Sequence, residues 1–531
     1  MITDSAGQAI RNLIAADFDV HVNNQSQELS SVEFVKSAPR RLILVVDDVG
    51  LSVSGAARVR QAVGDFISTQ LRADDEISIL RTRSGSGNRE EITADRKLLY
   101  AAVADIVADP AGEIAGTSRE QFALAGVVIT LRRALSGLGA VPGRKGLVLI
   151  SARLGRAQEH HDLFDRLTAL AADSSSVVYT MDIGGGGGLP LAGFTGGVNL
   201  GTGSAEALGR ALQDQDGYYL LQYRRGDELS TSSFELNAAP QVKVDVKKPG
   251  VQVRSRTNAL GKEVHEWEHR ARTEGQELLT GLNSPFGGGD IPLQVTGIYQ
   301  NSRERGSELT ALVWMDAREL TFTHQLNGRH RANAEIMIAA FNSSGFSAGQ
   351  TNATFALDLT AADFDKATTN GAVFQVQLGL RQTGVYQLRA TVRDTTSDKM
   401  GKGSQLVEVP EFASGELLLS GIVLSEKDSS SVKTGPGRRI FTRGSKLAFE
   451  YRILNAPAEV QVVLRLLHNG NVVYTGVPQD LPEIQLEDPK RRQVAGEITL
   501  GPALEDGRYY LRVTARSGTH LASSGIDFEV R

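Results

Sequence analysis

Cysteine is absent from this chain of 531 residues. Its absence excludes disulfides, thiol nucleophiles, iron–sulfur clusters and zinc sites built on cysteine. It does not fix the cellular compartment. Serine-based hydrolysis has little sequence support either, because the nine histidines are scattered along the chain.

Long apolar runs and an excess of charge are also missing. No run approaches the roughly 20 apolar residues of a membrane-spanning helix. The formal net charge of -5 gives no electrostatic reason to expect nucleic acid or an anionic membrane as partner. The two tryptophans, Trp267 and Trp314, are isolated, so no aromatic platform for bases or sugars is visible.

The first ten residues, MITDSAGQAI, are polar and do not resemble a signal peptide. Either the protein is cytoplasmic or this start is not the natural one. The abrupt beginning inside what looks like a strand favours the second interpretation.

Strands and helices alternate from Arg40 to about Arg224, in a chain long enough for three or four domains. The apolar segments RLILVV, GRKGLVLIS and SVVYTMDI predict buried strands, and helical periodicity fills the intervals between them. This alternation predicts a parallel sheet with helices on both faces. The ligand site of such a sheet lies at the carboxyl ends of its strands.

After Arg256 the pattern changes to a polar helical linker followed by short alternating segments, which are typical of antiparallel sandwiches. A GxYxLR segment occurs twice, at Gly384 and Gly507, and indicates two related sandwiches. The expected domains are an N-terminal β segment packing on the α/β domain, the α/β domain, the helical linker and the two sandwiches: 1–36, 37–258, 259–283, 284–412 and 413–531.

Six segments, in order along the chain, resemble the von Willebrand factor A-related family that is abundant in Acidobacteria. They are ITDSAGQAIRNLIAADFDVHVNNQSQEL, LILVVDDVGLS, GRKGLVLIS, FTGGVN, DGYYLLQY and VDVKKPGVQVRSR. The resemblance covers roughly residues 1–258 and does not extend to the C-terminal half. It implies a Rossmann-like A domain that binds a protein or peptide ligand. The two sandwiches expected after it, from the alternating segments, are of immunoglobulin-like type.

In many A domains a DxSxS loop, a threonine and a second aspartate hold a divalent metal that bridges to the ligand. Oxygen ligands of this kind suit Mg²⁺, Mn²⁺ or Ca²⁺. Asp47 matches the first position, but the two serine positions fall on Val49 and Leu51. A shift by one residue places Asp48, Gly50 and Ser52 in the pattern, which restores a single hydroxyl.

The other two metal positions are also altered. Thr117 is a candidate for the threonine, whereas Ser151-Ala152-Arg153 stands where the second aspartate belongs. Two interpretations therefore remain open. In the first, a degenerate metal site is formed by Asp47, Asp48, Ser52 and Thr117. In the second, the two aspartates cap a helix N-terminus and bind loop amides.

Three further motifs suggest metal or phosphate binding, and each has a simpler explanation. His265-Glu266-x-x-His269 has the H-E-x-x-H spacing of a zinc hydrolase but stands in a polar linker. In Glu159–Asp162 (EHHD), His160 and His161 are expected to lie in an exposed loop, with Asp162 near a helix start. The glycines at 184–188 lack the Lys-Ser/Thr end of a phosphate-binding loop, so a flexible loop at the rim is expected, with Asp182 near it.

The sequence favours a non-enzymatic binding or adhesion protein with no certain cofactor beyond a possible Mg²⁺ or similar cation. Its alternatives are a zinc metallohydrolase and a purely structural cell-envelope protein. The expected partner is a protein or peptide, and the expected location is outside the cytoplasm. The expected ligand-binding residues lie at strand ends and adjoining loops: Asp47, Asp48, Ser52, Thr117, Ser151 and Asp182.

Overall fold

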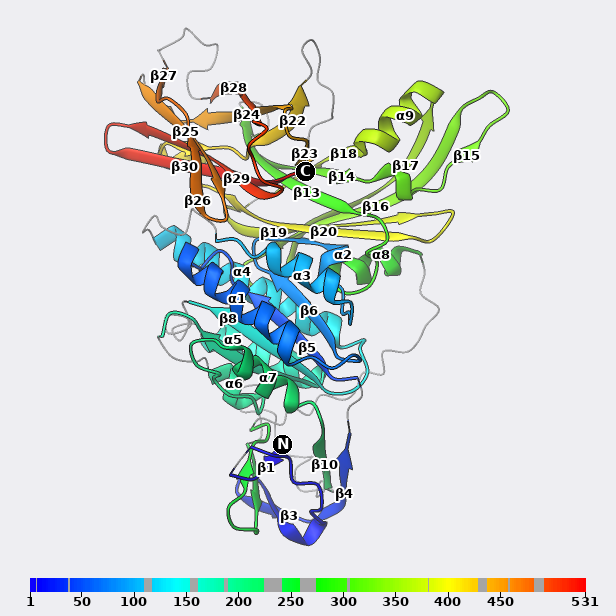
Figure 1. Cartoon of the computed structure of the whole chain (residues 1–531), viewed down its shortest axis with the longest axis vertical. Coiled ribbons are helices and arrows are strands. Elements are labelled where there is room, and N and C mark those ends of the chain that lie inside the picture. The colour runs from blue at the N-terminus through cyan, green and yellow to red at the C-terminus, as the bar shows by residue number, and fades with distance from the viewer. Residues whose placement is uncertain are drawn as a thin grey trace.

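The computed structural model places most of the chain in three tiers along its long axis (Figure 1). A small β unit with the N-terminus lies at one end, an α/β unit lies in the middle, and two β-rich units lie side by side at the other end. The structure describes residues 1–5, 7–36, 39–108, 117–152, 161–185, 190–223, 241–257, 274–302, 306–380, 382–427, 437–456, 459–481 and 491–531.

A four-stranded parallel sheet forms the centre of the α/β unit, with strand order β6-β5-β8-β9. Its strands are β5 (Arg41–Val46), β6 (Glu76–Arg81), β8 (Lys145–Ser151) and β9 (Ser176–Asp182). Every residue of β8 and β9 is buried. Burial on both faces explains why these segments are apolar throughout rather than alternating, and the predicted parallel sheet is confirmed.

Helices cover both faces of this sheet. Side chains of α1, α3 and α7 pack with Leu42, Leu44 and Val46 on one face. Side chains of α4, α5 and the short α6 pack with Ile43 and Val45 on the other. The helices of this unit are α1 (Val53–Thr69), α2 (Gly87–Glu90), α3 (Arg96–Ala104), α4 (Thr117–Leu138), α5 (His161–Asp173), α6 (Pro190–Phe194) and α7 (Ala205–Gln213).

The N-terminal strands pair with strands that follow the α/β unit in sequence, so the two ends of this region close on each other. The pairs are β1 with β12, β2 with β11 and with β3, and β4 with β10, all antiparallel. The strands are β1 (Ile2–Thr3), β2 (Phe18–Val22), β3 (Gln25–Gln27), β4 (Leu29–Val35), β10 (Tyr218–Tyr223), β11 (Val242–Val246) and β12 (Gln252–Val253), with a 3-10 turn at Ala15–Asp17. Phe18, Val20 and Val22 are buried on one face, as their alternation predicts.

The first β-rich unit packs a three-stranded sheet, β13-β14-β18, against a six-stranded sheet, with a shared apolar core. Its sixth strand, β7 (Ser84–Ser86), comes from the α/β unit and pairs with β20. The other elements are α8 (Glu274–Asn283), β13 (Leu293–Ser302), β14 (Gly306–Met315), β15 (Thr323–His324), β16 (His330–Asn342), β17 (Ser347–Leu359), α9 (Ala361–Asn370), β18 (Ala372–Leu378), β19 (Gly384–Asp394) and β20 (Met400–Val409), with a 3-10 turn at Ala317–Glu319.

The second β-rich unit packs a four-stranded sheet on a six-stranded sheet around its own core. A 3-10 turn at Phe412–Ser414 precedes it. Its strands are β21 (Leu418–Leu419), β22 (Val423–Lys427), β23 (Ile440–Phe441), β24 (Lys446–Leu454), β25 (Val460–His468), β26 (Asn471–Thr475), β27 (Gln479–Leu481), β28 (Arg491–Thr499), β29 (Gly507–Ser517) and β30 (His520–Val530).

The repeated GxYxLR segments begin β19 and β29 and make the same local structure. Gly384 and Gly507 have φ of 139° and 142°, which a residue with a side chain rarely adopts. In each segment the tyrosine hydroxyl donates to the carbonyl four residues upstream, from Tyr386 to Gln382 at 2.8 Å and from Tyr509 to Glu505 at 2.9 Å. The repeat therefore encodes a tyrosine corner in each unit.

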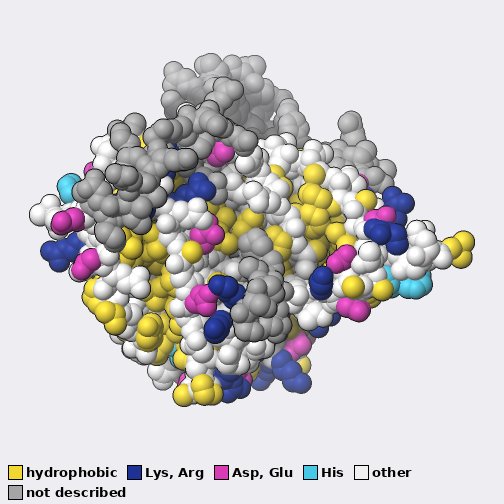
Figure 2. Space-filling model, turned by 90° about the horizontal axis from the view of Figure 1, so that it is seen from above, with side chains coloured by type: hydrophobic (Ala, Val, Ile, Leu, Met, Phe, Trp, Pro, Cys, Tyr) yellow, Lys and Arg dark blue, Asp and Glu magenta, His cyan; other side chains and the backbone are white. Residues whose placement is uncertain are grey.

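Seen from the end formed by the β-rich units, basic and acidic side chains are interspersed among hydrophobic groups (Figure 2). In the described part of the chain, no helix is both long enough and apolar enough to cross a membrane.

Candidate functional site at the strand ends

Asp47, Ser151 and Asp182 form one row across the carboxyl ends of three neighbouring strands. Ser151 is paired with Asp182 in the β8–β9 register. Asp47 follows the last β5–β8 pair, and its N–H donates to the Ile150 carbonyl at 2.9 Å. Residues in register on parallel strands point to the same face, so this row faces the side covered by α4, α5 and α6.

The row is buried and partly joined by hydrogen bonds. The three residues are between 1% and 2% exposed. The Ser151 hydroxyl donates to Asp47 Oδ2 at 2.7 Å, and the Gly50 N–H donates to Asp47 Oδ1 at 2.9 Å. Gly50 is needed there because a Cβ at that position would overlap the Asp47 carboxylate.

Asp182 has one oxygen satisfied and one not. Its Oδ1 accepts the N–H of Gly184 at 2.9 Å. Its Oδ2 is buried and has no hydrogen-bond partner among the residues that the structure describes. A buried carboxylate oxygen without a partner costs free energy, so a donor or a cation at this position would stabilise the folded protein.

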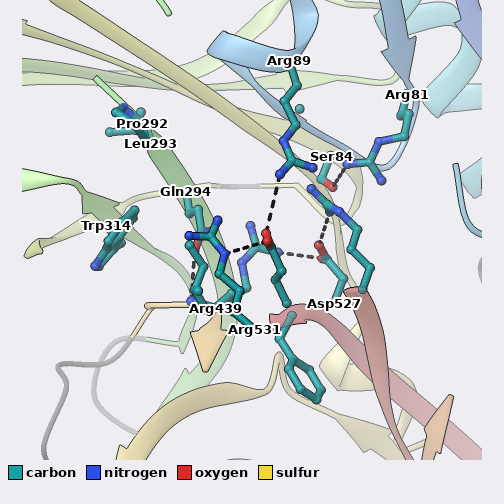
Figure 3. Close-up of a pocket in the computed structure, with 15 residues that line it drawn as sticks. Arg81, Ser84, Arg89, Pro292, Leu293, Gln294, Trp314, Arg439, Asp527 and Arg531 are labelled. Atoms are coloured by element: carbon teal, nitrogen blue, oxygen red, sulfur yellow. Dashed lines mark hydrogen bonds and ion pairs between the residues drawn. The ribbon is translucent and has the colours of Figure 1, made fainter. Parts of the chain in front are cut away.

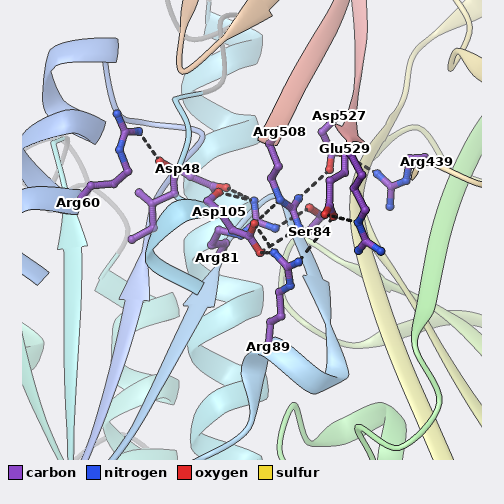
Figure 4. Close-up of polar contacts among 12 residues, drawn as sticks. Asp48, Arg60, Arg81, Ser84, Arg89, Asp105, Arg439, Arg508, Asp527 and Glu529 are labelled. Carbon is purple, nitrogen blue, oxygen red and sulfur yellow. Dashed lines mark hydrogen bonds and ion pairs between the residues drawn. The ribbon is translucent and has the colours of Figure 1, made fainter. Parts of the chain in front are cut away.

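Asp48 belongs to a different cluster on the opposite side of β5 (Figure 4). Its Oδ1 accepts the Thr82 hydroxyl at 2.9 Å and the Arg83 N–H at 3.0 Å, and Arg81 lies 3.5 Å from Oδ2. Burial raises the pKa of Asp48, while these three partners act in the other direction. Asp47 and Asp48 therefore do not converge on one ion, although they are adjacent in sequence.

Val49 and Leu51, which stand at the serine positions of the DxSxS pattern, are core residues. Val49 is 5% exposed and packs between α4 and the first β-rich unit, near Phe341 and Leu406. Leu51 is 1% exposed and packs beneath α1. Both side chains make apolar contacts, and those of Val49 join two units of the protein.

Of the remaining predicted ligands, the structure describes the side chain of Ser52. The Ser52 hydroxyl caps α1 by accepting the Gly55 N–H at 3.1 Å. Thr117 begins α4, but its side chain lies outside the described part of the structure. The same holds for the side chains of Glu159–Asp162, for the H-E-x-x-H segment at 265–269 and for the glycines at 186–188.

Among the described residues, the rim of the sheet is covered by other units on one half and includes exposed residues on the other. On the β5–β6 half, β7 pairs with β20, and Arg83 donates to the Tyr510 hydroxyl at 3.0 Å. On the β8–β9 half, Gly184 and Gly185 are exposed. Ser52 and Ser54 at the start of α1 are exposed as well. Sequence reasoning missed the covered half, because a contact between units leaves no local periodicity in the sequence.

Comparison with known proteins leaves the family open. No family model and no curated protein matches the chain. Among solved structures, the chain is similar to a Bacteroides uniformis β-glucuronidase (12% identity, TM-score 0.17) over 41% of this chain and 26% of that one. It is also similar to a Parabacteroides merdae β-glucuronidase (12%, 0.18) over 42% and 27%. The chain spans about a quarter of the length of these enzymes, and TM-scores this low carry no functional argument.

Proposed function

We propose that the chain is a non-enzymatic binding protein of the cell exterior, with a von Willebrand factor A-type unit and two immunoglobulin-like sandwiches. The A-type unit takes a protein or peptide ligand at the β8–β9 half of its strand-end rim. The observation that carries the proposal is the row Asp47–Ser151–Asp182, which is buried beside exposed loops and includes a carboxylate oxygen without a described partner.

The row offers more ligands for a weakly held divalent cation than the residues at the DxSxS positions do. Mg²⁺ binds through one or two carboxylates and keeps several waters. Asp47 and Asp182 would supply those carboxylates and Ser151 a hydroxyl. Asp182 on β9 thus compensates for the aspartate missing after β8. When bound, the cation would attract an acidic side chain of the ligand.

Isothermal titration calorimetry of the full chain with Mg²⁺ and with Mn²⁺ tests this proposal. We expect saturable binding by the wild type that Asp182→Asn abolishes, because the substitution removes charge and keeps shape. Asp48→Asn is the matched control. Asp48 lies outside the row, so this substitution should leave cation binding intact. Wild-type protein that binds neither cation, or equal loss in both variants, contradicts the proposal.

A purely structural role is the second candidate, and the covered half of the rim favours it. If that role holds, Asp182→Asn changes neither cation binding nor any partner interaction. The zinc-hydrolase alternative rests on His265 and His269, which the structure does not describe. It predicts one zinc per chain that is lost in His265→Ala.

A further inference from the structure

A cavity of about 90 Å³ lies where the α/β unit meets both β-rich units (Figure 3). It is separate from the Asp47–Ser151–Asp182 row. Because a buried water needs roughly 10–15 Å³ of such space, the cavity has room for several waters or one small ion. Pro292, Leu293 and Trp314 of the first β-rich unit form an apolar side, and arginines of the α/β unit and of the second β-rich unit lie around the rest.

Positive charge predominates in the wall of this cavity. Five arginines and two carboxylates line it: Arg81, Arg89, Arg439, Arg508, Arg531, Asp527 and Glu529. Two further carboxylates lie behind them, Asp105 beside Arg89 and Arg508, and Asp48 beside Arg81. Five guanidinium groups therefore face four carboxylates.

Asp527, an acidic residue of the cavity wall, is paired with two of these arginines. Asp527 accepts from Arg439 at 2.7 Å and from Arg508 at 3.1 Å (Figure 4). Although burial raises its pKa, the charges of Arg439 and Arg508 outweigh burial and hold the pKa of Asp527 well below its usual range. The arginines thus stabilise the negative charge of Asp527.

Arg439 and Arg531, two arginines of the cavity wall, are held by few or shared partners. Arg439 is 6% exposed; one terminal nitrogen pairs with Asp527, the other donates to the Val295 carbonyl at 3.2 Å, and its Nε has no described partner. Glu529 is shared by Arg531 at 2.8 Å and, at a longer 3.6 Å, by Arg89. The planar forks of arginine match the oxygens of phosphate in pairs.

We propose that this junction is a binding site for a small phosphate-type oxyanion, either inorganic phosphate or a small phosphate monoester. The anion would compensate the remaining positive charge and contact arginines of the α/β unit and of the C-terminal unit together. Trp314, Pro292 and Leu293 form an apolar side against which a small organic substituent would pack.

Calorimetric titration of the full chain with sodium phosphate, at constant ionic strength set by sodium chloride, tests this site. We expect saturable binding of one phosphate per chain and no comparable binding of acetate, whose single charge and two oxygens engage fewer guanidinium groups. Methyl phosphate binding tighter than phosphate identifies a monoester as the preferred ligand, and weaker binding identifies the free anion.

Two variants and one control assign the site. Arg439→Gln should weaken phosphate binding about tenfold or more, since it removes a buried charge-assisted donor. Arg531→Gln should weaken it severalfold, and this last residue is 58% exposed, so its replacement does not threaten folding. Arg516→Gln is the control, an exposed arginine on the same strand as Arg508. Wild-type protein without saturable phosphate binding, or equal weakening in Arg516→Gln and Arg531→Gln, overturns the proposal.

Discussion

Restoring the first serine of the DxSxS pattern by Val49→Ser should destabilise the protein without creating a metal site. Val49 is 5% exposed, in an apolar cluster that includes Ile129 of α4 and Phe341 and Leu406 of the first β-rich unit. Burying a valine side chain contributes about 1.5–3 kcal/mol, and a buried hydroxyl without a partner costs about 1–3 kcal/mol. Since serine keeps the Cβ of valine and loses only part of its apolar area, we expect a loss of about 2–4 kcal/mol in the free energy of unfolding.

Urea unfolding at neutral pH measures this loss, and two control variants separate its causes. Val49→Ala removes apolar volume alone, whereas Val49→Thr keeps the volume and adds the hydroxyl. Each should account for part of the effect of Val49→Ser. A Val49→Ser protein as stable as the wild type, with tighter Mn²⁺ binding, would refute the assignment of this loop to packing between units.

Three further outcomes follow from particular contacts. Gly50→Ala should cost about 1–3 kcal/mol of stability, because the new Cβ overlaps the Asp47 carboxylate; urea unfolding that matches the wild type contradicts this. Burial lowers the pKa of Lys402 to about 8, so the unfolded state binds more protons between pH 8 and 10 and stability should rise with pH in that window. Lys402→Met should reduce the slope of the free energy of unfolding against pH by up to about 1 kcal/mol per pH unit. Urea unfolding at pH 8, 9 and 10 measures this slope, and an unchanged slope would contradict the explanation. Deleting residues 1–33 removes the partners of β10, β11 and β12 and should lower the melting temperature, whereas an unaltered melt would show that these strands do not support the α/β unit.

Much of the fold could be predicted from the sequence where structure depends on local pattern. The apolar strand Leu42–Val46 and the helix that follows it were recognisable because burial on two faces and on one face produce different periodicities. The GxY segments at Gly384 and Gly507 were recognisable as a repeat, and the structure supplies the reason, a positive φ followed by a tyrosine corner.

The contacts between units could not be predicted in this way. Strand β7 completes a sheet whose other strands lie more than 200 residues further along the chain. Its three residues, Ser84–Ser86, are too few and too polar to show the hydrophobic pattern of a strand. The arginines around Asp527 are likewise dispersed from Arg81 to Arg531, so only the folded chain shows that they share one cavity.

The site itself was predicted in part. Asp47, Ser151 and Asp182 were expected at strand ends, and the register of β5, β8 and β9 brings them into one row. Asp48 was expected beside Asp47, but β5 ends at Val46 and the chain turns at Asp48, whose side chain joins Thr82 and Arg83 instead.

The most direct test of the account is a crystal of the full chain soaked in Mn²⁺ and measured for anomalous scattering. The account predicts a peak within about 2.5 Å of oxygens of Asp47 and Asp182, on the α4 side of the sheet, and no peak at Asp48. A fully hydrated or absent Mn²⁺ at the row, or a peak at Asp48, would contradict the claim that this row is the binding centre.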